Sequence, residues 1–93
     1  MTFTQVRAIV QRYCGNCHGT FPNYATFTSH SVAQCGGDTL ALSNDPANSA
    51  FLELVQGRCG AFLMPRGCTS APCIATSDIQ TVTTWVNEGA LNN

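Results

Sequence analysis

The chain has no lysine and few charges of either sign. Its 93 residues contain four basic side chains, all arginines, against five Asp and Glu, and the net charge is −1. A nucleic-acid-binding face needs a cluster of basic side chains, so these counts argue against one. Only 10% of the residues are charged, and we therefore expect Thr, Ser, Asn and Gln to keep the surface polar.

Long apolar runs are also missing. No run approaches the roughly 18 residues that a membrane-spanning helix needs, so no membrane span is expected. The opening M-T-F-T-Q lacks the basic-then-apolar pattern of a signal peptide, and we expect an exported protein whose signal has already been removed. With no internal repeat and no change of composition, residues 1–93 are predicted to form one domain.

Cysteine, by contrast, is abundant, with six in 93 residues. This density indicates either an oxidising compartment, periplasmic or extracellular, or metal chemistry. The spacing of the cysteines has to decide between them.

Apolar residues recur at helical spacing in three long segments. Residues 3–14 carry a stripe of Phe3, Val6, Ile9 or Val10, and Tyr13, with a capping box of Thr2 and Gln5 before it. Residues 45–57 are predicted as a second helix with Asp45 as N-cap, Pro46 at the first helical position and Gly57 at the end. Residues 77–88 form the third, with Ser77 and Gln80 as another capping box.

The remaining segments are shorter. Residues 24–30 are predicted as a short helix after Pro22, residues 36–38 as a turn, residues 40–42 as an extended piece and residues 58–76 as a loop. We find no β-hairpin signal. The expected fold class is therefore all-α, three main helices plus a short one.

The stretch C-G-N-C-H, Cys14 to His18, admits four interpretations. A structural zinc site needs four protein ligands, but the other four cysteines form no second Cys-x-x-Cys pair. A redox dithiol expects a βαβ context, whereas this pair follows a helix. A framework of three disulfides leaves His18 unexplained. Cys-x-x-Cys-His is the attachment signature of c-type haem, in which two thiols bond the porphyrin and the imidazole ligates the iron.

A second axial ligand is available further along the chain. Met64 lies in the loop, followed by Pro65, which restrains the backbone beside the sulfur. His30 is the alternative distal ligand, but its Thr-Ser-His-Ser setting is typical of a solvated side chain.

The order of these motifs resembles the small class I cytochromes c and the cytochrome c domains of larger bacterial enzymes. The resemblance rests on Cys14–His18, on Asp45-Pro46 with Ser49 and Phe51, on Met64-Pro65-Arg66-Gly67, and on Trp85 with Gly89-Ala90. It implies a small cytochrome c-like bundle around one covalent haem c. It further implies thioether bonds from Cys14 and Cys17, with His18 and Met64 as the axial ligands of the iron.

The four additional cysteines depart from that family's usual pattern. They allow three pairings, of which we favour Cys35 with Cys59 and Cys68 with Cys73. These two disulfides would stiffen the loop that contains Met64, here termed the methionine loop. Candidates for an apolar haem wall are Phe21, Phe51, Phe62, Leu63 and Trp85, and candidates for pairing with a haem propionate are Arg58 and Arg66.

With His and Met both bound, the iron has no open position. The resemblance then implies one-electron transfer through the porphyrin edge, not an enzyme, with a redox partner protein or a fused enzyme domain. Because the chain lacks a ring of like charges, docking should depend weakly on salt. Two other functions stay open: a five-coordinate haem peroxidase or gas sensor using His30, and a haem-free, disulfide-rich binding module.

Overall fold

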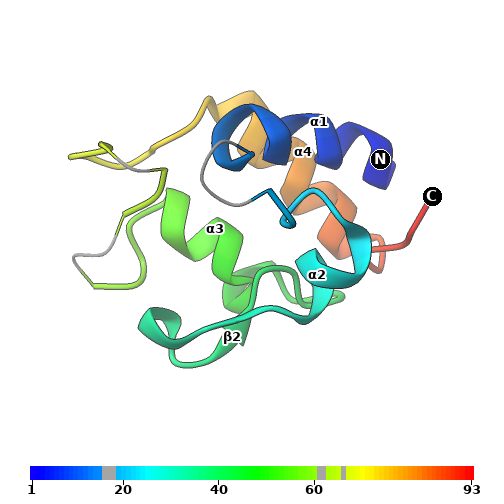
Figure 1. The fold of residues 1–93 in the computed structure, drawn as a ribbon, viewed down its shortest axis with the longest axis horizontal. Coiled ribbons are helices and arrows are strands. Elements are labelled where there is room, and N and C mark those ends of the chain that lie inside the picture. The colour runs from blue at the N-terminus through cyan, green and yellow to red at the C-terminus, as the bar shows by residue number, and fades with distance from the viewer. Residues whose placement is uncertain (16–18, 61–62, 66) are drawn as a thin grey trace.

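The structure is a computed structural model that describes residues 1–15, 19–60, 63–65 and 67–93. In chain order its elements are α1 (Phe3–Cys14), α2 (Tyr24–Ser29), β1 (Ser31–Val32), the 3-10 turn η1 (Ala33–Cys35), β2 (Asp38–Thr39), the 3-10 turn η2 (Pro46–Asn48), α3 (Ala50–Val55) and α4 (Thr76–Asn87) (Figure 1). No helix within these ranges is both long and apolar enough to cross a membrane.

Helices α1 and α4 pack against each other along one side of the molecule (Figure 1). The predicted apolar stripe of α1 is buried, and Thr2 and Gln5 form the expected capping box, with Gln5 N–H donating to Thr2 Oγ1 at 3.3 Å. Trp85 of α4 is fully buried, with its ring centre 5.6 Å from that of Phe3. The first predicted helix is therefore confirmed, and the first and last helices pack together near Trp85.

Helix α3 is the central element of the core. All six of its residues are buried, and Phe51 meets Phe27 of α2 with ring centres 5.5 Å apart. A six-residue helix is too short to be stable alone in water. Its stability therefore comes from the apolar surface that covers it on several sides.

The predicted all-α fold class is wrong, because β1 and β2 form a two-stranded antiparallel sheet and the domain is a small mixed α/β fold. The strands pair Ser31 with Thr39 and Val32 with Asp38. The chain reverses through Gly36 and Gly37, whose φ angles of 71° and 88° suit glycine. The turn was predicted, but strands of two residues are too short to show an alternating pattern, and the extended piece at 40–42 follows β2 without belonging to it.

The single helix predicted over residues 45–57 is also wrong, because Ser49 interrupts it with an extended backbone between η2 and α3. Ser49 is fully buried, and its hydroxyl accepts the Leu42 N–H at 2.9 Å and donates to Asp45 O at 2.9 Å. The Phe51 N–H donates to Leu40 O at 3.0 Å. The neighbouring segment thus takes the hydrogen bonds that a continuous helix would have used.

The predicted capping box of Ser77 and Gln80 does not form. Helix α4 begins one residue earlier, with Ala75 as N-cap and no side-chain cap. Ser77 therefore lies inside the first turn. Asp78 in that turn accepts a hydrogen bond from the Tyr13 hydroxyl at 2.9 Å and pairs with Arg12 at 3.3 Å. A contact with α1 thus holds the first turn of this helix.

Candidate functional site

Cys14 is the last residue of α1, and the end of that helix is well held. The Tyr13–Asp78 contact ties this turn to α4. Gly15 follows as the C-cap, and a Cβ atom on it would lie 2.7 Å from Gln11 O, closer than real contacts allow. The close approach to the last turn of α1 therefore favours a residue without a Cβ atom after Cys14. Cys17, the second predicted thioether residue, and His18, the predicted axial ligand, lie outside the described residues.

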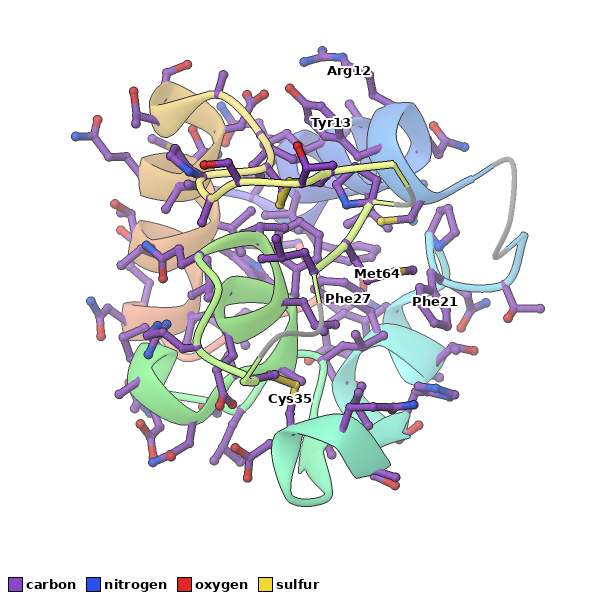
Figure 2. The ribbon with its side chains drawn as sticks, turned by 90° about the vertical axis from the view of Figure 1, so that its left-hand side faces the viewer. Arg12, Tyr13, Phe21, Phe27, Cys35 and Met64 are labelled. Carbon is purple, nitrogen blue, oxygen red and sulfur yellow. A yellow bond between two sulfur atoms is a disulfide. The ribbon has the colours of Figure 1, made fainter. Side chains whose placement is uncertain are left out.

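Met64 and Cys14 line the same small apolar cavity. The residues that line this cavity are Cys14, Phe21, Leu40, Phe51, Leu54, Val55, Met64 and Pro65. Figure 2 shows Met64 and Phe21 close together on one side of the molecule. The backbone N–H of Met64 donates to Leu54 O at 3.5 Å, which attaches the methionine loop to α3. The fold thus brings the predicted thiol and thioether, 50 residues apart in sequence, to one apolar wall.

The cavity has a volume of about 20 Å³, close to the space of one water molecule. The donor set suits haem c, because a thiol for the porphyrin and a soft thioether for the iron line the same apolar surface. A porphyrin is far larger than this cavity. The described lining residues would therefore have to move apart for one to enter.

The predicted haem wall is only partly reproduced at this cavity. Phe21 and Phe51 line it, whereas Leu63 and Trp85 are not among the described lining residues, and Phe62 lies outside the described residues. Trp85 belongs instead to the core between α1 and α4. The sequence interpretation missed four lining residues, namely Leu40, Leu54, Val55 and Pro65. The run of apolar residues that includes Val55 was the feature of the sequence from which part of this lining could have been predicted.

The alternative distal ligand and one candidate propionate partner lie elsewhere. His30 is exposed at the C-cap of α2, with its ring centre 5.0 Å from that of Phe21, and it does not appear among the described lining residues. Arg58 donates to Ala47 O at 3.0 Å and to the Gln56 side chain at 2.8 Å. Arg66, the second candidate, lies outside the described residues.

Both favoured disulfides are present. Cys35 of η1 is bonded to Cys59, and Cys68 is bonded to Cys73. Met64 lies between Cys59 and Cys68, so a bridge restrains the chain on each side of the methionine loop. The Cys73 N–H also donates to Val55 O at 2.8 Å, which returns the chain to α3. Two disulfides indicate an oxidising environment.

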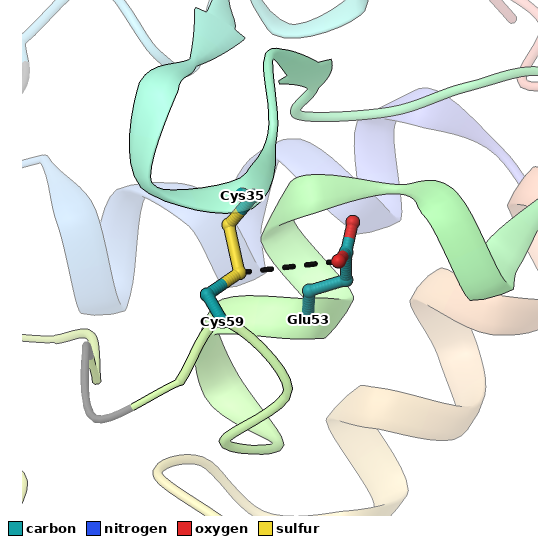
Figure 3. A group of neighbouring side chains, drawn as sticks. All are labelled: Cys35, Glu53 and Cys59. Atoms are coloured by element: carbon teal, nitrogen blue, oxygen red, sulfur yellow. Dashed lines mark hydrogen bonds between the residues drawn. A yellow bond between two sulfur atoms is a disulfide. The ribbon is translucent and has the colours of Figure 1, made fainter.

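A buried carboxyl group beside the first disulfide was not foreseen. Glu53 of α3 is 9% exposed, and its Oε2 lies 4.0 Å from Cys59 Sγ (Figure 3). Burial raises the pKa of Glu53 to about 7, helped by a hydrogen bond and charge repulsion from Asp38. The sulfurs of Cys35 and Cys59 and a Glu53 oxygen lie within 4.8 Å of one another, but the disulfide leaves no thiolate to bind a metal. The signal in the sequence was one acidic residue inside the apolar run F-L-E-L-V.

Comparisons of the chain with protein families, with curated proteins and with solved structures found no match. The functional argument therefore rests on the residues of this chain and on their arrangement.

Proposed function

We propose that this chain is a one-electron carrier with one covalent haem c. In this proposal Cys14 and Cys17 form the thioether bonds, and His18 and Met64 are the axial ligands. The observation that carries it is the position of Cys14 and Met64 on the lining of one apolar cavity.

The residues around the cavity have distinct tasks. Bound haem would supply a reversible one-electron couple. Phe51, Leu54 and Val55 of α3 exclude water from the site, and a low-dielectric wall together with a thioether ligand favours the ferrous state and so raises the reduction potential. The Tyr13–Asp78 contact holds Cys14 at the end of α1. Two axial protein ligands leave no open position for a substrate, which favours electron transfer over catalysis.

The setting follows from the disulfides and from the charge of the chain. Thioether attachment and two disulfides suit an exported protein, periplasmic or extracellular. The partner is a redox protein or an enzyme domain joined to this one. With four arginines, no lysine and a net charge of −1, the chain offers little charge for steering. We therefore expect the rate of electron transfer to change little with ionic strength.

The test begins with the full chain expressed in a host that attaches haem c outside the cytoplasm. The expected product has the mass of the chain plus one haem that survives denaturation, and its oxidised spectrum carries the weak near-infrared band of iron bound to methionine sulfur. A colourless product without added mass would refute the proposal and favour a haem-free binding module.

Two single substitutions then test the ligand. Met64→Ala should abolish the near-infrared band and allow carbon monoxide to bind the reduced protein. Leu63→Ala, a half-buried neighbour without a donor atom, is the matched control and should leave both properties unchanged. His30→Ala should also leave the spectrum unchanged. If His30→Ala abolishes the low-spin spectrum while Met64→Ala does not, the assignment of Met64 is wrong.

A further inference from the structure

The disulfide between Cys35 and Cys59 and the side chain of Glu53 form a buried group, here termed the disulfide–carboxyl cluster. The two cysteines are 7% and 8% exposed and Glu53 is 9% exposed. Figure 3 shows the carboxyl of Glu53 beside the disulfide, and its Oε2 atom lies 4.0 Å from Cys59 Sγ. A cysteine thiol at this place could exchange a proton with the carboxyl group.

The surroundings of Glu53 favour a neutral carboxyl group. Its Oε1 atom is buried and has no hydrogen-bond partner among the described residues, an arrangement that is unfavourable for an ionised carboxylate. Burial is the main cause of its raised pKa, and Asp38 of β2 and Asp45 raise the pKa further, whereas Arg58 lowers it. The cluster therefore holds a proton next to a disulfide.

We propose that Cys35–Cys59 is a redox-active disulfide that exchanges with external dithiols, and that Glu53 donates the proton taken up by the departing Cys59 sulfur. A thiolate of the dithiol attacks Cys35 Sγ, the bond between Cys35 and Cys59 breaks, and Cys59 leaves with the electron pair. Glu53 protonates that sulfur. The second thiol of the dithiol then attacks the mixed disulfide and releases the Cys35 thiol. The dithiol is oxidised by two electrons and the protein disulfide is reduced by two.

The attacked sulfur lies in a short hairpin that few residues hold together. Cys35 belongs to η1, between two strands that pair through only two residues each. Its neighbours Gln34 and Gly36 are exposed. Short, surface-exposed ladders open locally at low free-energy cost. Opening this hairpin exposes Cys35 while Cys59 stays next to Glu53 on the α3 side.

The second disulfide of the chain is an internal control. Cys68 Sγ lies 3.3 Å from the carbonyl oxygen of Ser70, a group that cannot donate a proton. Both disulfides are present in every molecule, so their reduction can be followed in one sample. The reaction uses no residue of the proposed haem site.

The experiment measures the reduction of each disulfide by dithiothreitol in the full chain, by rapid alkylation and peptide mass spectrometry, between about pH 5 and pH 9. Each rate is divided by the concentration of the dithiothreitol thiolate, because the thiolate is the attacking species. For Cys35–Cys59 the corrected rate should be constant at low pH and fall as Glu53 loses its proton. For Cys68–Cys73 it should be constant throughout.

Two variants identify the proton donor. Glu53→Gln should lower the corrected low-pH rate of Cys35–Cys59 by about tenfold or more and remove its pH dependence, since a positioned general acid is lost. Asp38→Asn should move the fall to lower pH, because a group that raises the pKa of Glu53 is gone. A pH-independent corrected rate in the parent chain, or a Glu53→Gln profile identical to the parent's, would overturn the proposal.

Discussion

The substitution Glu53→Gln also tests the electrostatics of the core, independently of any redox reaction. The pKa of Glu53 rises from an ordinary 4.5 to about 7 in the folded chain, first through burial and then through Asp38. One pKa unit corresponds to about 1.4 kcal/mol, so ionised Glu53 makes the folded state less stable by about 3 kcal/mol. Glutamine has nearly the same shape and carries no charge at either pH.

The sign follows from proton binding. Between pH 4.5 and about 7 the folded chain holds the Glu53 proton more tightly than the unfolded chain does. The free energy of unfolding therefore falls as the pH rises through this window, and the stabilising contribution of the protonated group is lost above it. The parent chain and the Glu53→Gln variant should have equal stability near the lower end of the window. Above its upper end the variant should be more stable.

Urea unfolding followed by the fluorescence of Trp85, at about pH 4.5 and about pH 8, measures this difference. We expect a gain of about 3 kcal/mol for Glu53→Gln at the higher pH and little change at the lower one. Asp38→Asn should show a smaller gain in the same direction, since it removes only part of the cause. Equal effects of Glu53→Gln at the two pH values would refute the reasoning that a buried, protonated carboxyl lies in this core.

Two further predictions concern the cross-links and the core. Replacing Cys35 and Cys59 by alanine opens a loop with a sequence separation of 24 and should lower the free energy of unfolding by about 3.5 kcal/mol. Replacing Cys68 and Cys73, with a separation of 5, should lower it by about 2 kcal/mol. Urea unfolding of both double variants measures the two losses, and a larger loss for the shorter loop would contradict this prediction. Phe27→Ala should cost about 3 to 5 kcal/mol because its side chain is fully buried. Phe27→Leu is the conservative control for thermal unfolding, and equal losses for the two variants would argue against tight packing at this position.

Part of the fold could be predicted from local patterns. Helix α1 was predicted with its correct limits and capping box, because its apolar stripe and its cap lie within one continuous segment. The disulfide pairing was also correctly favoured. The information that defines the helix lies within one short segment, and four cysteines allow only three pairings.

The errors share one physical cause. Residues 45–57 have a helical pattern, yet Ser49 uses its hydroxyl to bind the segment at Leu42, and the helix is divided. The strand pair forms because the chain reverses through the two glycines and brings the two segments side by side. In each case hydrogen bonds to a neighbouring segment of the chain outweigh the local preference.

By itself, the sequence determined helix α1 with its cap, the motif C-G-N-C-H and the small number of charged side chains. Only the tertiary structure decided which side chains meet. It placed Cys14 and Met64 on one apolar wall and buried Glu53 beside a disulfide. The reason is that periodicity reports which face of a segment is apolar, whereas the environment of a carboxyl or a sulfur depends on segments far away in the chain.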